Sequence, residues 1–356
     1  MKTEISVAKD NPTVLKQAGN ILKNGGLVAF PTETVYGLGA DALNENAAKK
    51  TYEAKGRPSD NPLIVHIATM DALPKIVKNI PEKARKVAET YWPGPLTMVF
   101  EKSDVVPYGT TGGLDTVAVR FPDHELAQAL IIEGGGYISA PSANSSGRPS
   151  PTTAGHVAED LSGKIDMILD GGAVEIGVES TILDVTVEPP MILRPGAISA
   201  EMLQEVIGAV EVDKAILDAE STQAPKAPGM KYRHYAPKAK LIVVEGTQED
   251  SVKAIQKLCE SLQHRGVLSG VIGTDETVAQ YSCGIVKSIG SREDEASIAH
   301  NLYGVLRAFD QEKVEYIYSE AFFGEGIGHA IMNRLLKAAG QQVLDAKTIL
   351  EQDILA

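Results

Sequence analysis

The sequence has few cysteines and no long apolar run. Its two cysteines, Cys259 and Cys283, are too few for a disulfide framework or a thiolate zinc site and too widely spaced for a CxxC pair. This usage predicts a reducing compartment. The opening MKTEISVAKD has no apolar core of a signal peptide, and no segment approaches the roughly 18 apolar residues of a membrane span. We therefore predict a cytoplasmic protein without a membrane partner.

Positive charge is scarce relative to negative charge. The chain has 34 lysines and arginines against 47 aspartates and glutamates, a formal net charge of -13. This balance repels polyphosphate backbones at long range, so no stable nucleic-acid binding is expected, although a local basic pocket for a small anion is compatible with it. An RNA-binding module with a concave surface remains the alternative, and a salt-dependent affinity for RNA would identify it.

The length and the segment pattern predict two domains joined by a linker. The 356 residues exceed what one hydrophobic core usually serves. Residues 1–210 alternate helical segments with short strands such as LTMVFE and TVAVRFP, which predicts an open mixed α/β sheet. Residues 211–239 include DAESTQAPKAPGM, which has the composition of a linker. Residues 240–356 again alternate strands and helices and predict a smaller, Rossmann-like α/β domain.

The common nucleotide-binding motifs are missing. The glycines of FGEGIGHA, at 324, 326 and 328, do not have the spacing of the dinucleotide fingerprint, and a tight turn that opens a helix is the favoured interpretation. No GxxxxGK[ST] pattern occurs. A bound nucleotide must therefore be held in another way.

Hydroxyl and cationic side chains gather at the ends of predicted strands in the first domain, where an open sheet can present them to a polar ligand. Lys55 and Arg57 can both reach one polyphosphate, and Arg120 suits bidentate capture of a carboxylate. The loop from Ser139 to Thr152 can cradle phosphate or ribose, with Gly147 allowing close approach. Each feature alone also has a plain structural explanation: a solvated helix end, a surface ion pair or a flexible loop.

The order of these motifs resembles the threonylcarbamoyl-AMP synthase family. The motifs are FPTETVYGLGADA, KGRPSDNPLIVHI, WPGPLTMV, TVAVRFP, SAPSANSSGRPSPT, ESTILD, ILRPGAI and GMKYRHYAP. The first seven are similar to its YrdC-like catalytic domain, and the last one, with the α/β segment after it, is similar to the two-domain form. The resemblance covers nearly the entire chain. It implies a YrdC-like twisted open mixed sheet with helices, followed by a Rossmann-like α/β domain.

The resemblance implies a reaction. L-threonine, bicarbonate or CO2, and ATP with Mg²⁺ would give L-threonylcarbamoyl-AMP and pyrophosphate. The product would pass to the tRNA threonylcarbamoyl transferase complex, which modifies the adenosine beside the anticodon of ANN-decoding tRNAs. No organic cofactor and no metal-ligating side chain are expected. A related class adenylates carbamoyl groups in hydrogenase maturation, but it carries paired CxxC motifs that two distant cysteines cannot supply.

The resemblance also implies roles for single residues. Arg120 would bind the amino-acid carboxylate and His66 the threonine hydroxyl. Lys55, Arg57 and Arg194 would act catalytically on the phosphates. The full set of expected threonine contacts is Thr34, His66, Arg120, Ala140 through its backbone, Ser180 and Thr181. The full set of expected ATP contacts is Lys55, Arg57, Asn61, Thr116, Ser142, Asn144, Ser150, Arg194 and Tyr235.

The segment APGMKYRHYAPKAK, residues 227–240, combines basic and aromatic side chains with helix-breaking residues. A solvated basic linker is the simpler interpretation. Its prolines restrict the chain, however, and tyrosines are poor choices for a solvated tether. We therefore expect a lid over the first domain, in which Lys231, Arg233 and His234 meet the ATP phosphates and Tyr235 covers the nucleotide.

Overall fold

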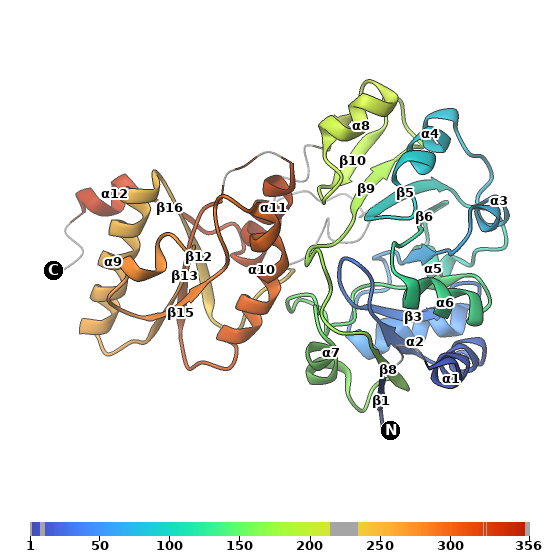
Figure 1. The fold of residues 1–356 in the computed structure, drawn as a ribbon, viewed down its shortest axis with the longest axis horizontal. Coiled ribbons are helices and arrows are strands. Elements are labelled where there is room, and N and C mark those ends of the chain that lie inside the picture. The colour runs from blue at the N-terminus through green and yellow to red at the C-terminus, as the bar shows by residue number, and fades with distance from the viewer. Residues whose placement is uncertain (1, 8–10, 214–233, 323, 325, 353–356) are drawn as a thin grey trace. The chain divides into compact units, whose positions relative to one another are not determined.

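The computed structural model describes residues 2–7, 11–213, 234–322, 324 and 326–352. The chain divides into two compact units (Figure 1). The first consists of Met1–Ser146 and Ser150–Tyr232, and the second of Gly147–Pro149 and Arg233–Ala356. Each unit is an α/β structure built around its own sheet, as the sequence predicts.

The first unit contains an 11-stranded mixed sheet with the strand order β1-β8-β2-β3-β7-β4-β6-β5-β9-β10-β11. Its strands are β1 (Glu4–Val7), β2 (Val28–Phe30), β3 (Gly37–Asp41), β4 (Ile64–His66), β5 (Leu96–Glu101), β6 (Thr116–Arg120), β7 (Ile138–Ser139), β8 (Met167–Asp170), β9 (Thr181–Asp184), β10 (Met191–Arg194) and β11 (Glu211–Val212). Its helices are α1 (Pro12–Lys23), α2 (Glu45–Lys55), α3 (Leu73–Ile76), α4 (Glu82–Tyr91), α5 (Tyr108–Thr111), α6 (Glu125–Glu133), α7 (Ala154–Leu161) and α8 (Ala200–Ile207). Since β11 pairs with β10, the sheet continues past residue 210, where the linker was expected to begin.

Local signals in the sequence set the ends of helix α2, which leads into the predicted phosphate cations. The Asn44 side chain accepts hydrogen bonds from the backbone N–H groups of Asn46 and Ala47, so it caps the first turn. Gly56 ends the helix in the left-handed conformation, with φ 61°. As a result, Lys55 lies on the last turn and Arg57 in the loop that follows.

One core of the first unit packs helices α4 and α8 against the sheet (Figure 1). It contains Trp92, the single tryptophan of the chain, which is 8% exposed. The indole Nε1 donates a hydrogen bond to the carbonyl oxygen of Leu96, at 2.7 Å. Trp92 is therefore a fixed, buried fluorophore that belongs to the first unit.

The second unit contains five parallel strands in the order β14-β13-β15-β12-β16. In Figure 1, α9 and α12 lie on one side of this sheet and α10 and α11 on the other, which is the doubly wound arrangement expected from the sequence. Its elements are β12 (Lys240–Glu245), α9 (Gln248–His264), β13 (Ser269–Gly273), β14 (Ile285–Ser288), α10 (Glu295–Phe309), β15 (Tyr316–Glu320), α11 (Ile327–Ala338), β16 (Val343–Asp345) and α12 (Ala346–Glu351). Cys259 and Cys283 are both buried and form no disulfide.

No helix within the described ranges is both long and apolar enough to cross a bilayer.

Candidate active site

Three of the predicted threonine contacts meet in the middle of the first sheet. Strands β4 and β6 are parallel neighbours, and His66 is paired with Arg120 at their carboxyl ends. Strand β7 runs antiparallel along the other side of β4, and the backbone N–H of Ala140, just past β7, donates to the carbonyl oxygen of Ile64 at 2.9 Å. The backbone contact expected of Ala140 would therefore have to use its carbonyl oxygen.

Burial keeps the imidazole of His66 uncharged. His66 is 3% exposed, and desolvation, assisted by the neighbouring charge of Arg120, lowers its pKa from 6.5 to about 3. Its Nδ1 lies 3.1 Å from the carbonyl oxygen of Ile64. Because a carbonyl can only accept, Nδ1 donates to it. The backbone of Ile138 also hydrogen-bonds the ring, and a contact of the ring with the threonine hydroxyl stays a prediction.

Thr34 lies in the loop FPTETVYG between β2 and β3, and its conformation is fixed from two directions. The Thr32 hydroxyl accepts hydrogen bonds from the backbone N–H groups of Thr34 and Val35. From outside the loop, the backbone N–H groups of Ile176 and Gly177 donate to the carbonyl oxygens of Glu33 and Thr34, at 2.8 and 3.1 Å. Thr32 and Thr34 are thus buried loop residues and not the strand residues that β-branching alone would suggest.

Ser180, Thr181 and Arg194 form a second polar cluster at the β9 and β10 strands. Arg194 donates through Nε to the carbonyl oxygen of Ser180 and through Nη2 to its hydroxyl, at 3.0 and 3.1 Å. The Ser180 hydroxyl also lies 2.8 Å from that of Thr97. The Thr181 hydroxyl donates to the carbonyl oxygen of Ile198, so it has no proton left for a ligand. Both hydroxyls thus already have partners within the protein, and their contact with a ligand stays a prediction.

Lys55 organises the hydroxyl-rich loop after β7. Its ammonium group, 3% exposed, donates to the carbonyl oxygens of Ser142 and Asn144, both at 2.5 Å. The Ser142 hydroxyl in turn donates to Oδ1 of Asn144, at 2.6 Å. Lys55 therefore fixes the shape of this loop, and a direct contact with phosphate stays a prediction.

Arg57, Asn61 and Thr116 lie toward the amino ends of β4 and β6. Arg57 donates to the carbonyl oxygens of Asn61 and Pro62, and the side-chain oxygen of Asn61 is buried without a hydrogen-bond donor among the described residues. Thr116 and Arg120 are the first and last residues of the five-residue strand β6, so about 13 Å separates them along the strand. These three predicted ATP contacts thus extend away from the pair of His66 and Arg120, whereas Arg194 lies beside the predicted threonine contact Ser180.

Ser150 and Tyr235 are the remaining predicted ATP contacts. The Ser150 hydroxyl donates to Oε1 of Glu179 at 2.5 Å. Tyr235 belongs to the second unit, where its ring stacks on that of Tyr303 with the centroids 5.2 Å apart, and its φ of 64° is unusual for a residue with a side chain. His234 is its neighbour in the chain, with the two ring centroids 5.5 Å apart. Lys231 and Arg233, the remaining basic residues named for the expected lid, lie outside the described residues.

Glu33 is a neighbour of the predicted site that the sequence interpretation missed. It is 5% exposed, and its Oε2 lies 2.7 Å from Nη2 of Arg120, which is 4% exposed. The charge of Glu33 also acts on the partly buried His124, where it raises the pKa against the larger lowering effect of burial. The one available signal was a carboxylate inside the otherwise hydroxyl-rich and apolar stretch FPTETVYG.

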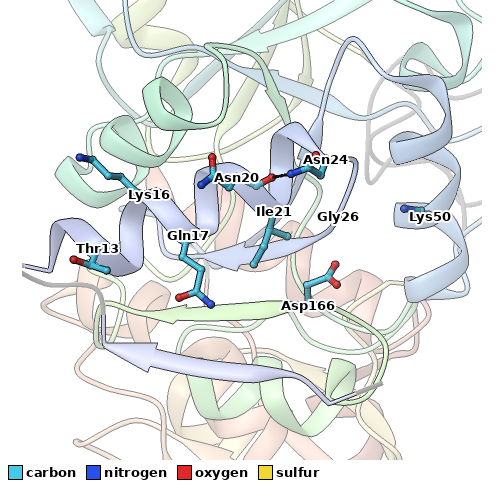
Figure 2. A pocket seen from close by; sticks show the side chains of 9 residues that line it. All are labelled: Thr13, Lys16, Gln17, Asn20, Ile21, Asn24, Gly26, Lys50 and Asp166. Carbon is cyan, nitrogen blue, oxygen red and sulfur yellow. Dashed lines mark hydrogen bonds between the residues drawn. The ribbon is translucent and has the colours of Figure 1, made fainter.

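Two hollows on the described surface lie largely apart from these clusters. Figure 2 shows one of about 670 Å³ beside helix α1, lined by polar side chains such as Gln17, Asn20 and Asp166 and by none of the predicted site residues. A second, of about 890 Å³, includes only Arg57 from the predicted set. Within the described ranges, no group of three or more His, Cys, Asp or Glu side chains is arranged to hold a metal ion.

Comparison with known proteins relates both halves of the chain to one group. The Sua5–YciO–YrdC family model, described as "Telomere recombination", matches residues 20–196. The model described as "Threonylcarbamoyl-AMP synthase, C-terminal domain" matches residues 198–340. The threonylcarbamoyl-AMP synthase of Pyrococcus abyssi is 50% identical over 330 residues, covering 93% of this chain and 95% of the relative. That of Bacillus subtilis is 50% identical over 335 residues, covering 94% and 95%.

Solved structures of similar chains agree with the fold. Sua5 from Pyrococcus abyssi with a histidine and a tyrosine replaced by alanine has a TM-score of 0.91 and 47% identity, over 96% of this chain and 98% of that one. Sua5 from the same organism in complex with L-threonine has a TM-score of 0.90 and 47% identity, over 97% and 98%.

Proposed function

The chain belongs to the threonylcarbamoyl-AMP synthase family in its two-domain form, and from this premise we propose its reaction. The enzyme joins L-threonine, bicarbonate or CO2, and ATP into L-threonylcarbamoyl-AMP and releases pyrophosphate. The observation that supports this best is the pairing of His66 with Arg120. A buried guanidinium beside a neutral imidazole matches the carboxylate and the hydroxyl of threonine.

Two bonds form in the proposed reaction. The lone pair of the threonine amine attacks the carbon of CO2 to give a carbamate. A carbamate oxygen then attacks the α-phosphorus of ATP, and the bond from phosphorus to the departing pyrophosphate breaks. ATP enters as its Mg²⁺ complex, and the ion comes with the substrate.

The protein's part in this chemistry is positioning and charge stabilisation, because negative charge accumulates on the phosphate oxygens. Arg57, at the amino end of β4, and Arg194, at the end of β10, supply cations. Lys55 acts through the loop that it holds, since its ammonium group already donates to Ser142 and Asn144. Ser142 lies toward the Asn61 end of β4, because β7 runs antiparallel to β4. The loop therefore leads from the threonine pocket toward the nucleotide.

The product is a mixed anhydride that water hydrolyses, so it needs a prompt acceptor. We propose that a tRNA threonylcarbamoyl transferase complex in the cytoplasm takes it up to modify the adenosine beside the anticodon of ANN-decoding tRNAs. Stable binding of nucleic acid by this chain is not part of the proposal, in keeping with its net charge of -13.

Pyrophosphate release from ATP tests the function. Release should require both threonine and bicarbonate, because the carbamate oxygen that attacks the α-phosphorus forms only when both are present. Serine should replace threonine poorly, since one methyl group in a close-fitting pocket contributes about 1–3 kcal/mol of discrimination. Equal release with and without threonine would refute the proposed reaction.

A further inference from the structure

The ion pair between Glu33 and Arg120 is incompletely satisfied. Oε2 of Glu33 and Nη2 of Arg120 are 2.7 Å apart. Yet neither Nη2 nor Nε of Arg120 is directed along a hydrogen bond, and neither carboxylate oxygen of Glu33 has a hydrogen-bond donor among the described residues. The two groups therefore neutralise each other by proximity and leave their directional bonding capacity unused.

Burying this ion pair costs folding free energy unless a ligand supplies the missing hydrogen bonds. Both side chains are at least 94% buried, and a buried charge that lacks hydrogen bonds loses its hydration without full compensation. The loop cannot relax away from the strand, because the Glu33 carbonyl oxygen is held by Ile176 and its neighbour Thr34 by Gly177. The unused donors and acceptors are thus kept in place at the carboxyl end of β6.

The unused groups match a zwitterion. Arg120 offers N–H donors to a carboxylate, and Glu33 offers lone pairs to an ammonium group. An α-amino acid carries one carboxylate and one ammonium group on the same carbon. Its binding would complete both members of the ion pair and leave the net charge of the pocket unchanged.

We propose that Glu33 binds the ammonium group of the amino-acid substrate and so restricts the pocket to ligands with a free amine. This inference rests on the proposed function, because it concerns the threonine pocket of that reaction. Glu33 holds the nitrogen on the side of Arg120 while the carboxylate is bound. It thereby fixes the direction in which the lone pair of the nitrogen points once the nitrogen has lost a proton to solvent.

Calorimetric titration of the full chain with two ligands tests this role. The ligands are L-threonine and (R)-3-hydroxybutyrate, which is threonine without its amino group. The wild type should bind threonine at least about 10-fold more tightly, since a hydrogen bond between charged groups typically contributes about 10- to 100-fold. Glu33→Gln should bind threonine more weakly by this factor. It should bind 3-hydroxybutyrate as well as the wild type does or better, because Arg120 is then free of a competing carboxylate.

The ratio of the affinities for threonine and 3-hydroxybutyrate distinguishes direct binding of the ammonium group by Glu33 from an indirect role in which Glu33 positions Arg120. If Glu33 only positions Arg120, the substitution weakens both ligands equally, and an unchanged ratio would overturn the proposal. Glu125→Gln is the matched control, since it removes the same charge from an exposed position on helix α6 and should leave both affinities unchanged. Equal affinity of the wild type for the two ligands would overturn the proposal even if Glu33→Gln does not fold.

The proposed function fails in a different way. A wild type that binds neither ligand, and releases pyrophosphate without threonine, would refute the amino-acid pocket and the role of Glu33 together. A wild type that needs threonine for pyrophosphate release, combined with an unchanged affinity ratio in Glu33→Gln, would refute the role of Glu33 alone.

Discussion

The buried, neutral His66 should make the first unit sensitive to mild acid. Its pKa is lowered from 6.5 to about 3 in the folded protein. Between these values the unfolded chain takes up a proton that the folded chain does not, so stability is fully present above pH 6.5 and is lost as the pH falls toward 3. From pH 7 to pH 5 the loss from His66 alone is about 2 kcal/mol.

The perturbation that isolates this effect is His66→Asn. The asparagine amide can still donate to the carbonyl oxygen of Ile64, as Nδ1 of His66 does, but it cannot titrate. The stability difference between wild type and variant should therefore shrink by about 2 kcal/mol between pH 7 and pH 5. The absolute stability of the variant does not matter, because only the pH dependence of the difference is compared.

Urea denaturation followed by tryptophan fluorescence is the suitable assay. Trp92 is the only tryptophan and lies in the core of the first unit, so its signal reports that unit and not the second. His264→Asn is the control, since it removes an exposed histidine from helix α9 of the second unit. A difference between wild type and His66→Asn that stays constant from pH 7 to pH 5 would refute the picture of an uncharged, desolvated imidazole.

Two further changes test the packing and the phosphate assignment. Gly196→Ala should destabilise the first unit by about 1–3 kcal/mol, because a Cβ there would lie 2.3 Å from the backbone nitrogen of Thr181; an unchanged urea midpoint of Trp92 fluorescence would contradict this. Arg57→Ala should lower turnover by about 10²–10³-fold with the fold intact, since its guanidinium is proposed to stabilise phosphate charge. Near-normal pyrophosphate release from a variant with a native circular dichroism spectrum would remove Arg57 from the phosphate site.

The sequence predicted the class of both sheets because their longer strands carry clear signals. LTMVFE and TVAVRFP are rich in β-branched and aromatic residues and became β5 and β6. Strand β3, GLGAD, was not foreseen, since its glycines weaken the β signal, yet it is required between β2 and β7. The short, mostly exposed strands β1 and β16 were also missed.

The site residues could be predicted where polar residues stand at the ends of strands. They could not be predicted where the role of a residue depends on its burial in the folded protein. His66 was expected as a threonine contact, but alternation could not predict its burial, because every residue from Asn61 to Ile67 is buried where β4 lies inside the sheet. Glu33 looks like an ordinary surface charge in the sequence, and only its burial against Arg120 shows otherwise. The hydrogen bonds of Lys55 connect it to residues far away in the chain, and such bonds cannot be inferred from composition.

The pairing of His66 with Arg120 on adjacent parallel strands has a mechanical consequence. Their separation is set by the backbone ladder between β4 and β6, with neighbouring strands about 4.8 Å apart, and not by the conformation of a loop. To change it, the centre of an 11-stranded sheet would have to come apart. The backbone of β4 and β6 beneath the proposed threonine pocket should therefore keep its shape throughout the catalytic cycle. The backbone positions of His66 and Arg120 should therefore survive changes in the surrounding loops, whereas the selectivity that depends on Glu33 should not, because Glu33 lies in a loop.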